Sequence, residues 1–261
     1  TVAVTARDEE RRATLAAAGA ARGGRIVALP CDVTDEEAMG RTVAEIEQTL
    51  GPIVLAVFNA GSYLPTRGER LDVLNLVRTF EINLFGTFYG LVPTVAYMQA
   101  RGHGHVVVLG SATAYFGVPS AGAYAASKAA LNSFAESMRY DFDKLNIRIQ
   151  VVNPGFVDTP MTENQTFRMP ALISADDAAR RIVAGLKRGG FEIHFPRRLS
   201  WLMKLLRVLP GPLRFHFINL RTGWARRPLQ KGRKPKSYAP RTDASEEADQ
   251  GRSGGASVEN R

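Results

Sequence analysis

The chain has 261 residues, 45% of them hydrophobic and 23% charged, which is enough for one large domain with a buried core and requires no second domain. Its single cysteine, Cys31, excludes an intrachain disulfide, and no Cys/His cluster has metal-ligand spacing, so we expect a cytoplasmic or cytosol-facing protein without a metal centre. The net charge of +9 is concentrated in residues 187–236, which hold 14 Lys and Arg against Glu192 alone; no nucleic-acid-binding motif accompanies it, which argues against a nucleic-acid partner.

Apolar runs and helix-forming stretches alternate along the chain. Strands are predicted at 2–5, 26–29, 53–58, 105–109, 147–152 and 191–195. Helices are predicted at 8–18, 35–50, 71–101, 124–145 and 175–186. This alternation predicts the α/β class, with a doubly wound parallel sheet between two layers of helices, and it places ligands at the carboxyl ends of the strands.

Polar residues follow two of these strands, and two more lie on one helix. Residues 59–61 (Asn-Ala-Gly) end one buried strand, and Ser111 follows another. Tyr124 and Lys128 are four residues apart on a helix, so they share one face and the ammonium can act on the phenol. A free phenol has a pKa of about 10, and a neighbouring cation favours the phenolate. The pattern indicates proton-transfer chemistry.

Each of these residues also has an ordinary structural interpretation. Tyr124 could be a core tyrosine, Lys128 a solvated helix lysine and Ser111 the start of a turn. Asn83 could be a polar residue that bends the long helix at 71–101. The occurrence of all of them in this order, each on a suitable element, favours the functional interpretation.

Residues 1–195 resemble the short-chain dehydrogenase/reductase family. The matching segments are Cys31-Asp32-Val33, Asn59-Ala60-Gly61, Asn83, Ser111, Tyr124-Ala125-Ala126-Ser127-Lys128 and Asn153-Pro154-Gly155. The resemblance implies a Rossmann-like domain and an oxidoreductase that transfers a hydride between a nicotinamide cofactor and a carbonyl or secondary alcohol.

The same resemblance implies a role for each catalytic residue. Tyr124 is the general acid/base, and Lys128, together with the cationic nicotinamide, lowers its pKa and binds the nicotinamide ribose. Ser111 polarises the substrate carbonyl, and Asn83 holds a water that links Lys128 to solvent.

Cofactor residues are implied as well. They are Asp32 and Val33 at the adenine, Asn59, Ala60 and Gly61 beside the nucleotide, and Pro154, Gly155, Val157 and Thr159 near the nicotinamide and the phosphates. Asp32 could also serve as a helix cap. Ala6 and then Arg7 end the first strand, where NAD-preferring relatives usually have a carboxylate, so NADP is favoured and NAD is the alternative.

One departure from the family is large. The family begins with a strand and a Gly-rich loop that binds the pyrophosphate, whereas this sequence begins at what resembles the family's second strand. We interpret this as a truncation. In the chain as given, we expect the sheet to lack a central strand and the neighbouring strands to expose unpaired edges.

The substrate is expected to be a lipophilic ketone, aldehyde or secondary alcohol. Its pocket would be lined from 113–119 and from a lid at 156–171. The candidate lining residues are Thr113, Tyr115, Phe116, Val118, Met161, Phe167 and Met169. These side chains could equally be ordinary packing.

The carboxyl-terminal part of the chain is basic. Residues 196–227 form an amphipathic extension that could lie on an anionic membrane surface, cover a lipophilic substrate, or pack at a subunit interface of the expected homo-oligomer. Residues 228–261 are predicted to be disordered. A competing hypothesis is a noncatalytic dinucleotide-binding or membrane-surface protein derived from the same family.

Overall fold

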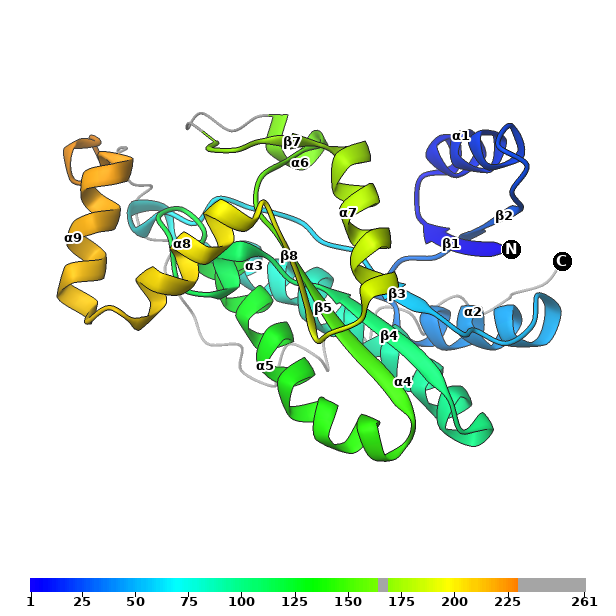
Figure 1. Cartoon of the computed structure of the whole chain (residues 1–261). Coiled ribbons are helices and arrows are strands. Elements are labelled where there is room, and N and C mark those ends of the chain that lie inside the picture. Colours follow the sequence, from blue (N-terminus) through cyan, green and yellow to red (C-terminus); the bar gives the residue numbers. More distant parts are fainter. Residues whose placement is uncertain (164–168, 230–261) are drawn as a thin grey trace, which may run out of the picture. The chain divides into compact units, whose positions relative to one another are not determined.

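Strands and helices alternate along most of the computed structural model, which describes residues 1–163 and 169–229 (Figure 1). The strands are β1 (Val2–Ala6), β2 (Ile26–Pro30), β3 (Ala56–Phe58), β4 (Gly104–Leu109), β5 (Ile147–Pro154), β6 (Val157–Asp158), β7 (Ile173–Ser174) and β8 (Glu192–Phe195). The α-helices are α1 (Glu9–Ala20), α2 (Glu36–Thr49), α3 (Val73–Phe80), α4 (Gly86–Arg101), α5 (Gly122–Lys144), α6 (Pro160–Glu163), α7 (Ala175–Arg188), α8 (Arg197–Val208) and α9 (Gly211–Thr222). All belong to the unit Thr1–Pro228. Apart from 228 and 229, the predicted disordered tail lies outside the described residues.

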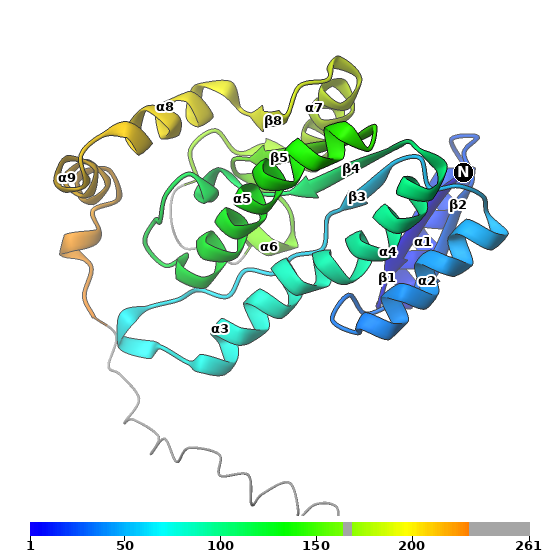
Figure 2. The ribbon, with the colours of Figure 1, turned by 90° about the horizontal axis from the view of Figure 1, so that it is seen from below.

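The main sheet has the order β3-β4-β5-β8, and every pair in it is parallel. Helices α4 and α5 cover one face and α7 the other, which is the predicted α/β arrangement (Figure 2). The middle of β4, residues 106–108, is fully buried, because branched apolar side chains fill both faces of a sheet that is covered on both sides. The fold class is therefore confirmed.

A second, two-stranded parallel sheet contains β1 and β2. Within the described residues, β1 and β3 pair with no further strand, so each has one open edge, as the sequence predicted for a sheet without a central strand. The prediction of a strand buried on both faces at 53–58 was wrong. Only 56–58 is a strand, and Val54, Leu55 and Val57 are 59%, 41% and 45% exposed, since among the described residues no strand pairs with the free edge of β3.

The predicted helix at 71–101 is continuous but not uniform. Helices α3 and α4 are joined by a π-helical turn, η2 (Glu81–Phe85), which contains Asn83. A π turn adds a residue to the helical repeat and redirects the side chains that follow, and such turns occur often at functional sites. Here it directs the buried Asn83 side chain towards the end of β3 and towards α5.

The basic extension contains two helices, α8 and α9, separated at Pro210. Helix α8 packs on β8. No helix within 1–163 and 169–229 is long and apolar enough to cross a membrane. In the same residues, no group of His, Cys, Asp and Glu is arranged to hold a metal ion.

Candidate active site

Ser111 and Tyr124 meet at the carboxyl end of β4. Ser111 follows this strand and is 7% exposed, and Tyr124 lies in the first turn of α5. Ser111 lies close enough to the phenol to lower the pKa of Tyr124. The Oγ of Ser111 accepts bonds from the backbone N and the hydroxyl of Thr113, at 3.1 and 2.9 Å. With its acceptor positions used in this way, Ser111 keeps its own hydroxyl hydrogen for donation.

The phenol of Tyr124 is not acidified by the protein alone. Burial raises the pKa of Tyr124, and the hydrogen bond with Ser111 lowers it in part. Desolvation of the phenol therefore outweighs the effect of Ser111. The lysine Nζ donates to the carbonyl oxygen of Leu109 at 2.6 Å. The lowering expected from Lys128 together with the cationic nicotinamide stays a prediction.

Lys128 is a buried group and not a solvated helix lysine, since it is only 3% exposed. Burial lowers its pKa to about 8. A Cβ built on Gly61 would lie 3.5 Å from both the Lys128 Nζ and the Asn83 Oδ1. The predicted Asn-Ala-Gly turn therefore brings its backbone close to the lysine head group, as a nucleotide-binding turn requires.

The side chain of Asn83 joins three segments. Its Oδ1 accepts from the Ser62 backbone N at 2.7 Å, and its Nδ2 donates to the Ser62 carbonyl and to Ser127 Oγ, both at 3.0 Å. Asn83 is fully buried. It thus holds the loop after β3 against α5 near Lys128, a structural role that the sequence analysis did not anticipate.

Tyr63 is a site residue that the sequence analysis missed. Its ring lies edge-on to that of Tyr124, with 5.3 Å between the centroids, and its hydroxyl donates to the Ser120 carbonyl at 3.2 Å. It therefore restricts the orientation of the Tyr124 ring. Its position two residues after Gly61 was the only available signal.

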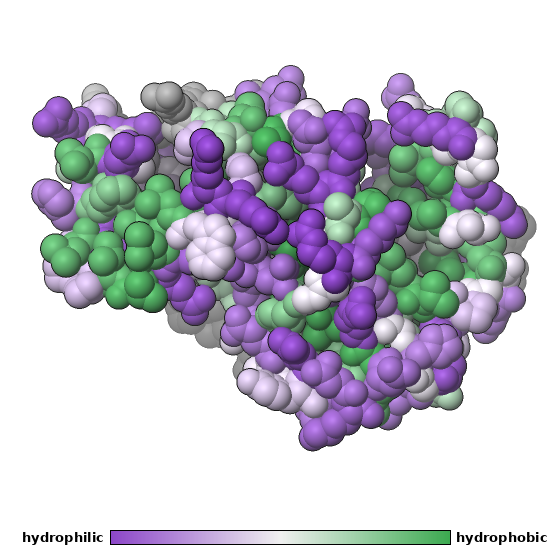
Figure 3. Space-filling model, viewed as in Figure 1, coloured by the Kyte–Doolittle hydropathy of each residue, from purple (hydrophilic) through white to green (hydrophobic). Residues whose placement is uncertain are grey.

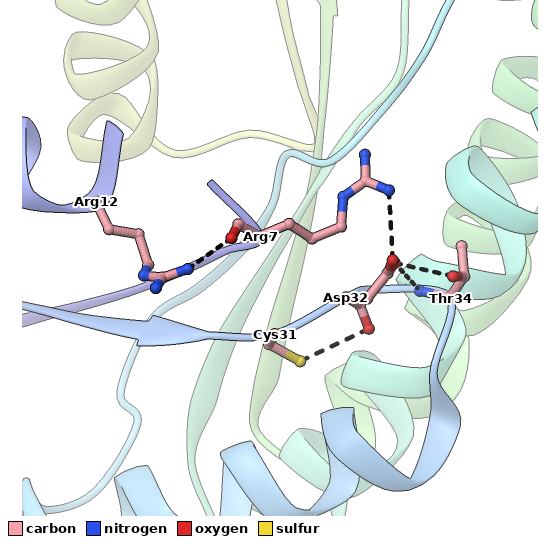
Figure 4. A network of polar contacts seen from close by, with 5 residues as sticks. All are labelled: Arg7, Arg12, Cys31, Asp32 and Thr34. Carbon is pink, nitrogen blue, oxygen red and sulfur yellow. Dashed lines mark hydrogen bonds and ion pairs between the residues drawn. The ribbon is translucent and has the colours of Figure 1, made fainter. Parts of the chain in front are cut away.

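Arg7 and Asp32 come together at the carboxyl ends of β1 and β2, with Arg7 Nη1 3.3 Å from Asp32 Oδ2 (Figure 4). The backbone hydrogen bond from Thr34 is the main cause that lowers the pKa of Asp32, and Arg7 contributes. A carboxylate from the segment after β2 thus lies beside Arg7, although the end of β1 itself has Ala6 and no acidic residue. Arg12, a second cation that the sequence analysis overlooked, donates to the backbone carbonyls of Ala6 and Arg7.

The other predicted cofactor residues differ in exposure and contacts. Val33 and Ala60 are half-buried, whereas Asn59 is exposed, at the end of a strand that pairs only with β4 among the described residues. Val157 lies on β6, and its carbonyl accepts from the hydroxyl of Thr162 at 2.8 Å and from that of Thr159 at 3.4 Å. The carbonyl of this loop is therefore already bonded within the loop.

Pro154 and Gly155 are the remaining predicted cofactor residues. Pro154 ends β5, where it pairs with Phe195, and the backbone N of Gly155 donates to the Phe195 carbonyl at 2.7 Å. The turn after β5 is thus fixed to the end of β8.

The predicted substrate residues do not share one environment. Thr113 is hydrogen-bonded to Ser111, but Tyr115 is buried and its hydroxyl donates to Glu192 Oε1 at 2.5 Å. The sequence analysis did not include Glu192, because a single carboxylate in a basic segment resembles any surface residue. Tyr115 is thus held inside the protein by its hydrogen bond to Glu192 and does not line an open surface beside Ser111.

The other lining candidates are more open. Phe116 lies 5.8 Å from the guanidinium of Arg214, Val118 is half-buried, and Met161 is 39% exposed on α6. Met169 is half-buried, and Phe167 lies outside the described residues. An open hollow of about 430 Å³, lined by His103, His105 and Arg148 among others, lies at the amino ends of β4 and β5, away from this cluster.

Comparisons with known proteins identify the family. The family model described as short chain dehydrogenase matches residues 1–169. A protein of Myxococcus xanthus named only as an uncharacterized oxidoreductase is 32% identical over 193 residues, which are 74% of this chain and 76% of that protein. The chain belongs to the short-chain dehydrogenase family, a family of oxidoreductases.

Two further relatives are more distant. Human 17-beta-hydroxysteroid dehydrogenase 13 is 25% identical over 69% of this chain, and the chain spans 61% of its length. A crystal structure of a short chain dehydrogenase from Burkholderia cenocepacia in complex with NADP has a TM-score of 0.68 and 23% identity, with 84% of each chain covered. The latter shows the shared fold.

Lys128 gives a prediction for the pH dependence of stability. Its folded-state pKa of about 8 lies below the ordinary value of 10.5, so between these values the unfolded chain binds more protons. The penalty for burying Lys128 is complete below about pH 8 and is relieved as the pH rises. We expect the free energy of unfolding, measured with urea, to rise from about pH 8 to about pH 10 relative to Lys128→Met. The exposed-site control Lys187→Met should follow the wild type; equal slopes in wild type and Lys128→Met would contradict the lowered pKa.

Proposed function

We propose that this protein transfers a hydride between NADP(H) and a carbonyl or secondary alcohol, with Ser111, Tyr124 and Lys128 as the catalytic residues and Asn83 as their support. The observation that supports the proposal is the proximity of Ser111 and Tyr124 at the carboxyl end of β4, with the buried Lys128 head group beside the turn at 59–61. The hydride comes from, or returns to, the nicotinamide.

The residues present fit such a cofactor. Because Gly61 has no side chain, its backbone approaches the Lys128 head group and leaves space there that suits a ribose hydroxyl. Arg7 has a side chain that is 63% exposed, so its guanidinium can bind a phosphate while it remains near Asp32. Asp32 and Val33 would lie at the adenine.

The protein's own part in the reaction is proton transfer and orientation. Ser111 donates its hydroxyl hydrogen to the substrate oxygen, and Tyr124 gives that oxygen its proton during reduction and accepts it during oxidation. The raised pKa of Tyr124 keeps the phenol protonated, which is the form needed for reduction. Lys128, with a pKa of about 8, is close to the point of exchanging its own proton.

A lipophilic substrate is favoured within this proposal. The residues beyond Ser111 that remain open, Phe116, Val118 and Met161, are apolar. The human relative named as a hydroxysteroid dehydrogenase supports the same class, because a steroid is a large apolar ligand.

Replacing Tyr124 tests the mechanism. In the full chain, Tyr124→Phe should lower kcat for NADPH-dependent reduction of lipophilic ketones about 10²- to 10⁴-fold, because the proton donor is lost while the ring remains. Tyr140→Phe, at a tyrosine that is 76% exposed, is the control and should match the wild type. Unchanged kcat in Tyr124→Phe would refute the mechanism, and NADPH binding without turnover in the wild type would favour the noncatalytic alternative.

Replacing Arg7 tests the cofactor preference. Arg7→Ala should lower kcat/KM for NADPH about 10-fold and leave that for NADH nearly unchanged, because a charged hydrogen bond to the 2′-phosphate is lost. Arg11→Ala, also on the exposed amino-terminal side of α1, is the control. An equal loss with both cofactors would contradict a role of Arg7 in binding the 2′-phosphate.

A second proposal concerns residues 197–227, which we infer to bind an anionic membrane surface from the cytoplasmic side. Four apolar residues face solvent on one side of α8: Trp201, Leu202, Leu205 and Val208, which are 62%, 39%, 60% and 76% exposed. Arg197 and Arg198, both exposed, lie on the same side. Apolar atoms also gather over α9 (Figure 3). A solvent-facing apolar stripe flanked by cations is typical of interfacial helices.

Charge favours a membrane over a second copy of the chain as the partner of this surface. Residues 197–227 hold eight Lys and Arg and no Asp or Glu. Two such surfaces would repel each other, whereas anionic lipid contributes about 1 kcal/mol of attraction for each cation near it.

A matched pair of double variants tests this surface with the full chain and vesicles that contain phosphatidylglycerol. Leu205→Ser with Val208→Ser should reduce vesicle binding about 10-fold, because exposed apolar area is lost from the proposed contact. Val73→Ser with Leu74→Ser on α3 is the control, since these side chains are 59% and 73% exposed and have the same chemistry. The proposal would be overturned if both double variants lost vesicle binding equally, or if the wild type bound neutral vesicles equally well. It would also be overturned if the wild type were a dimer without vesicles and Leu205→Ser with Val208→Ser dissociated it.

A further inference from the structure

A chain of polar contacts connects the extension to Ser111. Glu192, at the start of β8, accepts hydrogen bonds from the Tyr115 hydroxyl at 2.5 Å and from Asn153 Nδ2 at 2.7 Å, and its other oxygen is bonded to Lys204 Nζ of α8. The amide oxygen of the same Asn153 accepts from the Ser111 backbone N at 2.9 Å. Glu192 is the only carboxylate among residues 187–236. Glu192, Tyr115, Asn153 and Lys204 have no part in the proton transfer proposed above.

The charge of Glu192 determines how Asn153 is oriented. Burial raises the pKa of Glu192, but the hydrogen bonds from Lys204, Tyr115 and Asn153 lower it by more, so the group is a carboxylate. A carboxylate only accepts hydrogen bonds, so the NH2 group of Asn153 must face it. The amide oxygen of Asn153 is then directed to Ser111.

Packing prevents another arrangement of this amide. Asn153 is 1% exposed. A Cβ built on Gly110 would lie 2.1 Å from the Asn153 Oδ1, so the amide oxygen occupies the space that a side chain at position 110 would need. A shift of the amide would therefore disturb its hydrogen bond to the Ser111 backbone N.

We propose that Glu192, paired with Lys204, is a positioning residue for the catalytic Ser111 and acts through the amide of Asn153. The inference rests on the proposed function, because it assigns Ser111 a catalytic role. It makes helix α8 a part of the active-site framework. If the ion pair served only to attach α8 to β8, its loss would change stability and leave the pH dependence of the reaction unchanged.

The test compares Glu192→Gln, Lys204→Met and Lys204→Arg in the full chain, with the exposed Lys187→Met as control. Without the cation of Lys204, the partly buried carboxyl of Glu192 binds a proton more readily. The acid-side fall of kcat in Lys204→Met should therefore begin at higher pH than in the wild type. Lys204→Arg should restore the wild-type profile. Glu192→Gln should lower kcat about 10-fold at all pH values, with KM for NADPH changed less than about twofold.

A second measurement is independent of turnover. The NMR signals of the Asn153 side-chain NH2 and the Ser111 backbone NH should shift in Glu192→Gln and Lys204→Met, and should stay unchanged in Lys187→Met. Unshifted signals, or an unmoved acid limb in folded Lys204→Met, would overturn the inference. If Lys204→Met does not fold, Glu192→Gln decides the outcome by the same signals. Absent turnover in the wild type would refute the proposed function, and the NMR shifts would still decide whether Glu192 positions Ser111.

Discussion

The pairing of β4 with β5 is the constraint on which the site depends. Leu109 is opposite Val152, and beyond them Gly110 N donates to the Val152 carbonyl, so the ladder continues past the end of β4. At the next residue the acceptor is a side chain and not the backbone, because Ser111 N donates to Asn153 Oδ1. Ser111 is thus held in place by the sheet itself, and a rigid framework of this kind is what a reacting geometry requires.

Burial shifts the pKa values of Tyr124 and Lys128 in opposite directions, but its effect on charge is the same in both. It raises the pKa of Tyr124 and lowers that of Lys128, and in both cases it disfavours the charged form. The protein alone therefore keeps the phenol uncharged, and it lets Lys128 lose its proton at a lower pH than an exposed lysine. The proton balance of such a pair responds readily to a charged ligand beside it.

The open edges of β1 and β3 affect the two halves of the cofactor site differently. Arg7 and Asp32 belong to the small β1–β2 sheet, whereas Ser111, Tyr124 and Lys128 belong to the main sheet and its helix α5. The catalytic half depends on strands that are paired on both sides or buried, and it is closely packed. The nucleotide half depends also on the loop after β3. Asn83, in the π-helical turn η2, holds this loop through its hydrogen bond with the Ser62 backbone N.

The sequence by itself determined the α/β class, the strand at 105–109, the placement of Ser111 at its end and the common face of Tyr124 and Lys128. These features follow from local periodicity and spacing, which are properties of neighbouring residues. Only the tertiary structure decided the roles of Glu192, Lys204 and Tyr63, the exposure of β3, the separation of the described strands into three sheets and the direction of each pKa shift. Those depend on which distant side chains meet and how much water they exclude, and neither quantity is written in local sequence.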